Sequence, residues 1–422
     1  MVWRRERRAV SFCRCCGAFF CTPMTDTTEQ AKAHFFEANA HFEAGRLEDA
    51  LGSFRAALSL APGRPSILAN LGITQVRLEQ WAVAVDTLTQ ATQADPSNRD
   101  AWLALAHAHE ALQHWAPAVQ ALQKALPLGS PTAAIWLALA RCQLRLERPA
   151  EALRGFEEAL TLDATLAEAW SQRGSLLRDA GELAEAARSF QQALVHGGDD
   201  ELNRFYLASV TKQPAPERPP LAYVEALFDE YAGNFQTHLV EDLNYQAHRT
   251  LLAPLVESGA HFLRVLDLGC GTGLCGQLIR PQADGVDGVD VSGAMVVQAR
   301  ASGMYRQVVQ GDLLPFLEAS TEPADLVMAA DVFIYVGALE AVFAAVRQRL
   351  APGGCFAFSV ERTDAGQDLV LLPSLRYAHA SAYVERLANA TGFRVVRQWE
   401  APLREDQRRP VMGLYFHLAP AV

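Results

Sequence analysis

Apolar residues follow two different patterns along the chain, and one gives way to the other near residue 211. Between residues 31 and 200, small and large apolar residues recur at helical spacing, which predicts a series of amphipathic helices. From residue 221 onward, short apolar runs alternate with helical segments, which predicts strands separated by helices. A chain of 422 residues is expected to hold two or three domains, here an all-helical part followed by an α/β part.

The helical part repeats every 34 residues in five units, which start at positions 31, 65, 99, 133 and 167. Alanine or glycine at positions 8, 20 and 27 of each unit lets two helices approach closely, and phenylalanine or leucine at position 24 fills the space between them. This pattern is similar to the tetratricopeptide repeat. Stacked units of that family form a superhelix, and Glu201–Val210 is expected to cap it. The concave groove of such a superhelix binds a partner peptide or docks another domain, and the alternative is that the array is only a stable helical spacer. The candidate groove residues are Asn39, Asn70, Gln75, His107 and His109.

Four prolines between Thr211 and Pro220 separate the two parts of the chain. Proline cannot continue a helix, so this segment is predicted to be a semi-rigid linker. The expected domains are therefore a disordered or mis-started basic tail (1–30), the repeat domain (31–210), the linker (211–220) and the α/β domain (221–422).

The α/β part contains seven strand candidates. They are Phe262–Asp267, Gly285–Asp290, Tyr305–Val309, Asp325–Ala330, Cys355–Val360, Phe393–Trp399 and Gly413–Leu418. The helix candidates are Leu274–Arg280, Gly293–Ala301, Leu339–Leu350 and Ser381–Ala390. Alternation of strand and helix predicts a parallel sheet with helices on both faces. The last two strands have no helix between them, so they are expected to pair antiparallel.

The most informative motif follows the first of these strands. Asp267 ends an apolar run, and glycines at 269, 271 and 273 form a turn that leads into a helical segment. Such glycines let a ligand lie against bare main chain. A second acid, Asp290, ends the next apolar run. This arrangement resembles the cofactor loop of class I S-adenosylmethionine-dependent methyltransferases. The resemblance covers roughly residues 225–418 and implies a seven-stranded, Rossmann-like methyltransferase domain.

A dinucleotide-binding domain is the competing interpretation, because residues 271–276 also fit G-x-G-x-x-G and Asp290 lies nineteen residues beyond Gly271. Asp267 stands directly before the turn, where it would repel a pyrophosphate but attract a cationic methionine group. Asp312 follows the third strand as an acid does in methyltransferases, and the antiparallel C-terminal pair also suits that family. Methyl transfer is therefore preferred over hydride transfer.

The resemblance implies roles for individual residues around S-adenosylmethionine. The first acid and the glycines would surround its methionine and ribose, and the second acid would accept hydrogen bonds from both ribose hydroxyls. The remaining residues would contact adenine or face the sulfonium. The implied cofactor-binding residues are Asp267, Gly269, Gly271, Gly273, Asp290, Val291, Met295, Asp312, Leu313 and Ala330.

The acceptor of the methyl group is not specified by any one motif. The fourth strand leads into Ala-Asp-Val-Phe-Ile-Tyr335 and lacks the Asn/Asp-Pro-Pro-Tyr box of enzymes that methylate planar amines, which argues against DNA or glutamine acceptors. Residues 228–239 resemble a lid helix, and residues 374–379 concentrate polar side chains in a loop. Asp331 and His379 are the candidate bases. The candidate substrate-binding residues are Tyr231, His238, Tyr335, Arg376 and Tyr377, with Arg376 expected to bind an anionic group.

Three hypotheses therefore remain open: a small-molecule methyltransferase, which is favoured, a protein methyltransferase that recruits its substrate through the repeats, and a non-catalytic scaffold. The intact acids and glycines argue against the scaffold. A net charge of −11 makes nucleic acid an unlikely partner, and no apolar run approaches the ~18 residues of a membrane span.

Cysteine usage bears on metals and location. Four of the eight cysteines crowd the first 21 residues, where Cys-x-Cys-Cys would suit a metal. Five arginines in the same stretch and the Met24 that follows favour a mis-started or disordered tail instead, so no metal is predicted. The other cysteines are scattered, which is typical of a reducing compartment, so a cytoplasmic location is expected.

Overall fold

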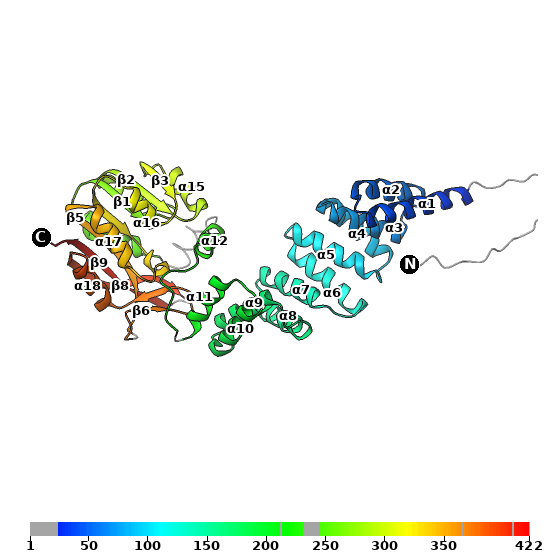
Figure 1. Cartoon of the computed structure of the whole chain (residues 1–422). Coiled ribbons are helices and arrows are strands. Elements are labelled where there is room, and N and C mark those ends of the chain that lie inside the picture. The colour runs from blue at the N-terminus through cyan, green and yellow to red at the C-terminus, as the bar shows by residue number, and fades with distance from the viewer. Residues whose placement is uncertain (1–23, 212, 232–244, 365, 407–408, 422) are drawn as a thin grey trace, which may run out of the picture. The chain divides into compact units, whose positions relative to one another are not determined.

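The chain is arranged as two compact units. The computed structural model describes residues 24–211, 213–231, 245–364, 366–406 and 409–421. Its contacts divide the chain into Met1–Asp163 and Ala164–Val422, so the fifth repeat belongs with the α/β domain (Figure 1). None of the described helices combines the length and the apolarity that crossing a bilayer requires.

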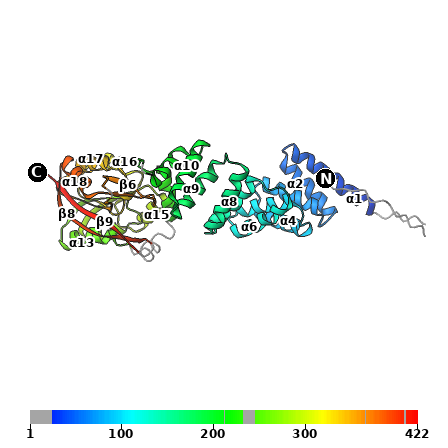
Figure 2. The same cartoon turned by 90° about the horizontal axis from the view of Figure 1, so that it is seen from below.

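The first unit consists of helix–turn–helix repeats, which confirms the predicted all-helical superhelix (Figure 2). The small residues of the repeat pattern lie where helices meet: Ala38, Ala50 and Ala57 are fully buried. A Cβ atom on Gly72 would lie 2.5 Å from Cγ of Leu88, so glycine is required for that close approach. The helices are α1 (Met24–Glu43), α2 (Leu47–Leu60), α3 (Pro65–Arg77), α4 (Trp81–Ala94), α5 (Arg99–Ala111), α6 (Trp115–Ala125), η1 (Leu126–Leu128), α7 (Ala133–Arg145) and α8 (Pro149–Leu162).

The second unit begins with the last repeat, α9 (Ala167–Asp179) and α10 (Leu183–Val195), followed by α11 (Asp200–Val210). The carboxylate of Asp199 caps α11 by accepting a hydrogen bond of 2.9 Å from the backbone N–H of Leu202. The further helices are α12 (Leu221–Tyr231), α13 (Ala247–Glu257), α14 (Leu274–Ile279), η3 (Arg280–Gln282), α15 (Gly293–Ala301), α16 (Leu313–Ala319), η4 (Phe333–Tyr335), α17 (Glu340–Arg349) and α18 (Ser381–Ala390).

The sheet of the second unit confirms the predicted mixed topology, with one addition. The described strands are β1 (Phe262–Leu268), β2 (Ala283–Asp290), β3 (Gln307–Gln310), β4 (Ala324–Ala329), β5 (Leu350–Arg362), β6 (Leu369–Leu371), β7 (Tyr377–His379), β8 (Phe393–Asp406) and β9 (Arg409–Pro420). Strands β3-β2-β1-β4-β5 run parallel, and β9 lies antiparallel between β5 and β8. The sheet has nine described strands instead of the predicted seven, because residues 369–379 form a hairpin whose β7 pairs with the end of β5.

Alternate residues of each strand face opposite layers of the unit. Leu266 and Leu268 of β1 pack into a core with α16, α17 and α18, whereas Val265 packs with α13 and α14 on the other face. Because helices cover both faces, most side chains of the parallel strands are apolar; Asp287, buried within β2, is an exception and pairs with Arg264 of β1. This burial leaves the carboxyl edge of the sheet as the place where polar side chains gather.

The capping helix α11 packs on the β6–β7 hairpin. Phe205 is 1% exposed, and its ring centroid lies 6.4 Å from that of Tyr377 and 5.6 Å from that of Tyr223 on α12. Leu371 and Leu375 of the hairpin belong to the same apolar cluster. The capping helix α11 therefore shares an apolar cluster with the α/β domain.

The proline-rich segment is anchored to the domain. The carbonyl oxygen of Glu217 accepts hydrogen bonds of 3.0 Å from the backbone N–H groups of Gly337 and Ala338. The carbonyl oxygen of Pro216 accepts one of 2.8 Å from the hydroxyl of Tyr377. Residues 216–218 thus form a strap on the domain, in addition to linking it to the repeats.

Replacing Gly337 with alanine should loosen this strap. The new Cβ atom would lie 2.8 Å from the Glu217 carbonyl oxygen and 2.9 Å from that of Pro216. Overpacking of this kind costs about 1–3 kcal/mol. We expect faster cleavage by Glu-C protease after Glu217, and no change for Gly52→Ala, whose Cβ meets open space. Equal cleavage rates in both variants would show that the strap is not held there.

Candidate cofactor and acceptor site

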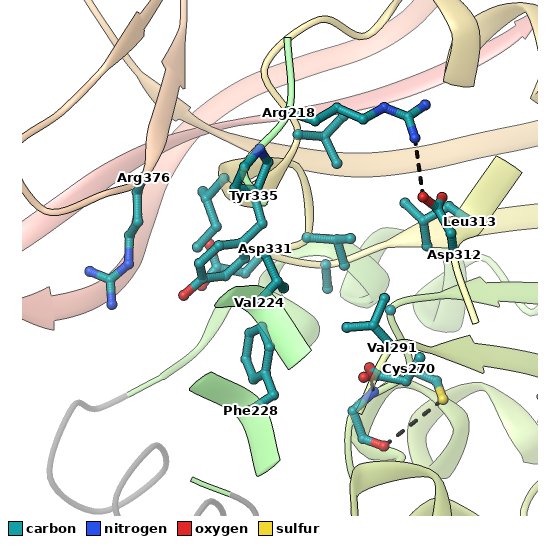
Figure 3. Close-up of a pocket in the computed structure, with 18 of the residues that line it drawn as sticks. Arg218, Val224, Phe228, Cys270, Val291, Asp312, Leu313, Asp331, Tyr335 and Arg376 are labelled. Carbon is teal, nitrogen blue, oxygen red and sulfur yellow. Dashed lines mark hydrogen bonds and ion pairs between the residues drawn. The ribbon is translucent and has the colours of Figure 1, made fainter. Parts of the chain in front are cut away.

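A cavity of about 410 Å³ lies at the carboxyl edge of the sheet (Figure 3). Its lining comes from the glycine loop after β1, the ends of β2 and β4, the segment after β3, η4, the β6–β7 hairpin and β8. Helices α11 and α12 and the 216–218 strap complete it. Open α/β sheets bind ligands at this edge, so the cavity is the candidate site.

Glycine is required in the loop after β1 for two reasons. Gly269, Gly271 and Gly273 have φ angles of 66°, 53° and 98°, which side-chain-bearing residues rarely adopt. A Cβ atom on Gly269 would also lie 2.6 Å from Cγ2 of Val332. Gly269 and Gly271 line the cavity, whereas Gly273 caps α14 just behind the lining. The loop therefore presents bare backbone to a ligand.

Asp290, at the end of β2, is bound to the backbone of two loops. Its two carboxylate oxygens accept hydrogen bonds from the N–H groups of Gly271, at 2.8 Å, and Ser292, at 3.0 Å. Burial raises the pKa of Asp290, and these backbone N–H groups counteract part of that rise. Each carboxylate oxygen has two lone pairs, so the group retains acceptor capacity toward the cavity that it lines.

Asp267 lies behind the lining of the cavity. It is 1% exposed, and Oδ2 accepts a hydrogen bond of 2.7 Å from the hydroxyl of Tyr305, which itself accepts one from the N–H of Gly276. Burial raises the pKa of Asp267 to about 7, even though the hydrogen bond from Tyr305 lowers it. Through Tyr305, Asp267 therefore supports α14, the helix that follows the glycine loop, and its pKa lies near neutrality.

This shift predicts a pH-dependent effect of Asp267→Asn. A carboxyl whose folded pKa is about 7 holds a proton that the unfolded chain has lost above pH ~4. Native stability from this group is therefore present below pH ~4 and lost as the pH rises to 7. The free energy of unfolding of the variant, relative to that of wild type, should therefore rise by roughly 1 kcal/mol per pH unit between pH 5 and 7. Calorimetric unfolding of both proteins measures this, and Asp284→Asn on the exposed end of β2 should give a constant difference. A constant difference for Asp267→Asn would contradict the raised pKa.

The predicted adenine contacts are only partly at the cavity. Val291, Asp312 and Leu313 line it, whereas Met295 is fully buried behind it. Ala330, which is expected to face the sulfonium, also lines the cavity. Asp312 caps α16, since Oδ1 accepts a hydrogen bond of 3.1 Å from the N–H of Leu314. Its other oxygen forms an ion pair of 3.1 Å with Arg218 of the strap (Figure 3).

The candidate base Asp331 lines the cavity but is paired. It has a φ angle of 57°, and its N–H donates a hydrogen bond of 2.9 Å to Oγ of Ser359. Nη1 of Arg404 lies 3.0 Å from its Oδ1, and Nη2 of Arg404 lies 2.5 Å from Oε2 of Glu361. Burial alone would lower the pKa of Arg404, but the two carboxylates more than offset this and raise it.

The structure does not bring His379, the second candidate base, to the cavity. It is fully buried, its Nε2 lies 2.7 Å from the carbonyl oxygen of Gly337, and burial lowers its pKa to about 4. A neutral, enclosed imidazole of this kind positions the backbone that holds the strap. Tyr377 is likewise fully buried and donates its hydroxyl hydrogen bond to the strap, so neither residue lines the cavity.

Two of the predicted substrate residues do line the cavity. The ring of Tyr335 packs edge-on against that of Phe228 from α12, with centroids 5.1 Å apart. Arg376 comes from the hairpin, and its guanidinium forms no hydrogen bond or ion pair with any residue that the structure describes, although its carbonyl oxygen accepts a hydrogen bond from the N–H of Leu372. Tyr231 ends α12, but its side chain is not described, and His238 lies outside the described residues, as does most of the predicted lid.

Four residues that line the cavity or support it are not among those the sequence predicts: Glu201, Arg218, Tyr305 and Arg404. Arg218 and Arg404 are separated by 94 and 73 positions from the carboxylates with which they pair, so no local pattern could reveal them. Of the four, Tyr305 alone lies in a predicted strand, as its first residue.

Family models match both parts of the chain. Residues 265–354 match a model described as a methyltransferase domain. Tetratricopeptide repeat models match residues 31–64, 70–131, 104–167 and 137–201. The chain therefore combines tetratricopeptide repeats with a segment that matches a methyltransferase domain.

The curated relatives to which the chain is similar include two kinds of methyltransferase. The malonyl-[acyl-carrier protein] O-methyltransferase of Enterobacter lignolyticus is 30% identical over 39% of this chain and 64% of its own length. The trans-aconitate 2-methyltransferase of Paracidovorax citrulli is 32% identical over 27% of this chain and 44% of its own. The chain thus spans about half the length of the curated relatives it matches, from 44% to 64%. The crystal structure of the N-methyltransferase NodS from Bradyrhizobium japonicum, in complex with S-adenosylhomocysteine, is 18% identical, with a TM-score of 0.39, over 47% of this chain and 98% of that one.

Proposed function

We propose that the chain transfers a methyl group from S-adenosylmethionine to a small carboxylic acid bound in the cavity under α12. The proposal rests on the cavity's size, on its glycine loop and on which of its arginines are paired with a carboxylate. The names of the two relatives, which act on malonyl and trans-aconitate groups, support an acid as acceptor. The repeats would serve as a separate module for a partner.

The residues present fit the cofactor. The loop at Gly269 has no room for a side chain, Asp290 retains acceptor capacity for ribose hydroxyls, and Val291 and Leu313 offer apolar surface for adenine. Asp312 would meet the adenine edge. When bound, S-adenosylmethionine supplies a methyl group already activated by a positively charged sulfur.

Arg376 carries the acceptor proposal. Two other arginines line the cavity, and each is neutralised by a carboxylate: Arg218 by Asp312, and Arg404 by Asp331. Arg376 is half-buried and has no such partner among the described residues. A half-buried guanidinium with free donors is suited to bind a carboxylate through two parallel hydrogen bonds.

An acid acceptor also agrees with the state of Asp331. A carboxylate arrives deprotonated and needs no general base, whereas an alcohol or amine acceptor would need one. Asp331 is bound by Arg404 and His379 lies away from the cavity, so neither is available as a strong base. In this proposal Asp331 contributes negative charge beside the reacting centre, and positioning does most of the catalysis.

The test is to incubate the full chain with methyl-labelled S-adenosylmethionine and the small-molecule fraction of a cell extract. We expect labelled esters that release methanol in mild base. Arg376→Gln should raise KM by about tenfold or more, because a charge-assisted hydrogen bond is lost. Arg386→Gln, on the exposed face of α18 and paired with Asp368, is the matched control. Base-stable label, or an unchanged KM in Arg376→Gln, would overturn the acid acceptor.

The repeats support a second role, binding of a protein or peptide. A cavity of about 350 Å³ in the first unit has Arg99, His107 and Glu110 of α5 among its lining residues. If the repeats instead recruit a protein acceptor, label from the same assay in whole extract will appear in protein bands and be lost in His107→Ala. If the domain is only a scaffold, no S-adenosylhomocysteine will bind.

A further inference from the structure

The repeat array supplies a charged residue to the cavity. Glu201, on the capping helix α11, lines the cavity together with residues of the methyltransferase domain. It lies four positions before Phe205, so both side chains project from the same face of the helix. Phe205 is packed against Tyr377 of the hairpin, and this contact directs that face toward the domain.

Glu201 and Arg376 are the charged side chains of this cavity that form no hydrogen bond or close ion pair within the described part of the chain, although Arg376 acts at longer range on Glu361. Glu201 is exposed and forms no hydrogen bond or ion pair with a described residue, and it does not pair with Arg376. By contrast, Asp312 and Asp331 are paired with arginines, and Asp290 is bound by backbone N–H groups. One carboxylate, that of Glu201, and one guanidinium, that of Arg376, are therefore available to bind a ligand.

Glu201 and Arg376 project from elements that pack against each other. Arg376 stands one residue before Tyr377, which contacts Phe205 of α11 and donates to the Pro216 carbonyl. Leu371 and Leu375 of the hairpin extend the same apolar contact. Because both charged residues project from elements that share one small core, packing limits the positions that each can take toward a ligand in the cavity.

We infer that Glu201 is an acceptor-binding residue and that the acceptor is dipolar, with a cationic amine held by Glu201 and a carboxylate held by Arg376. The inference rests on the proposed function, since it extends the acid acceptor to the amino-acid class. It also gives the capping helix α11 a part in choosing the substrate, in addition to any partner that the groove binds.

The experiment measures binding to the full chain saturated with S-adenosylhomocysteine, by ligand-observed NMR. The probes are ω-amino acids from 4-aminobutanoate to 6-aminohexanoate, with hexanoate and hexylamine as matched ligands of single charge. At least one dipolar probe should bind about fivefold more tightly than hexanoate, the gain expected from one exposed ion pair. Glu201→Gln should abolish this preference while hexanoate binding persists, and Arg376→Gln should weaken both acids.

Asp200→Asn is the matched control, because it removes the same charge from the neighbouring position of α11, and Asp200 does not line the cavity. Dipolar probes that bind no better than hexanoate, or a preference that survives Glu201→Gln, would overturn the inference and leave the acid acceptor intact. Failure of all acids to bind would overturn both.

Discussion

Replacing Asp290 with alanine is expected to weaken binding of S-adenosylhomocysteine to the full chain by roughly 100-fold. The carboxylate has two functions that alanine cannot perform. It accepts hydrogen bonds from Gly271 and Ser292, which fix the loops on either side of the cofactor cavity, and it offers its remaining lone pairs to the ribose. Hydrogen bonds to a charged group contribute about 1.5–3 kcal/mol, so loss of such contacts gives an effect of this size. Isothermal calorimetry measures the affinity.

Asp284→Ala is the control for this experiment. Asp284 lies on the same strand, β2, but it is exposed and pairs with His261 at the opposite end. Its removal should leave the affinity unchanged. Affinity within threefold of wild type for Asp290→Ala would show that the cavity at this edge does not hold the cofactor's ribose.

Replacing Arg404 with methionine should destabilise the methyltransferase domain by roughly 3–5 kcal/mol, the usual cost of leaving a buried charge without its partner. Arg404 is 4% exposed and joins Asp331 to Glu361, so the variant leaves two enclosed carboxylates beside each other. Methionine fills most of the volume of the arginine side chain, so an empty cavity would contribute little to the loss of stability. Hydrogen exchange of β5 and β8 reports the opening free energy of this region without interference from the repeats.

The pH dependence separates charge from packing in this variant. Burial already raises the pKa of Glu361, and without Arg404 it should rise further. A carboxyl with a raised folded pKa stabilises the native state as the pH falls through that value, so the defect should be smaller at pH 5 than at pH 8. A defect independent of pH would indicate lost packing instead. Arg362→Met, which breaks an exposed cluster with Asp364 and Glu400, should have no measurable effect on the same strands.

The sequence predicted the architecture well because its signals are local and repeated. The 34-residue period marks where helices touch, and the buried Ala38, Ala50 and Ala57 are those contacts. The seven apolar runs correspond to β1–β5, β8 and β9. By contrast, β6 and β7 have three residues each, too few to show a period, and Pro315 interrupts the helical pattern of α16.

The site was predicted where it depends on the glycine motif and less well elsewhere. The loop, Asp290 and Asp312 follow strands whose ends must meet at one edge of a parallel sheet. His379 and Tyr377 are polar residues in a stretch that reads as a loop, yet they form a buried strand that supports the strap. Arg404 lies on the part of β8 beyond the predicted strand end at Trp399, and its pairing depends on the register of β8 with β9.

The packing of α11 against the α/β domain limits which repeats of the chain could be gained, lost or exchanged. Whole repeats could be gained, lost or exchanged before Ala164 without altering any residue of the cofactor and acceptor cavity. The fifth repeat and α11 have no such freedom, because a shift of register there would displace Glu201 and the packing of Phe205. A graft of a different repeat array should therefore join the chain near residue 164 and leave the proline-rich strap with its own domain.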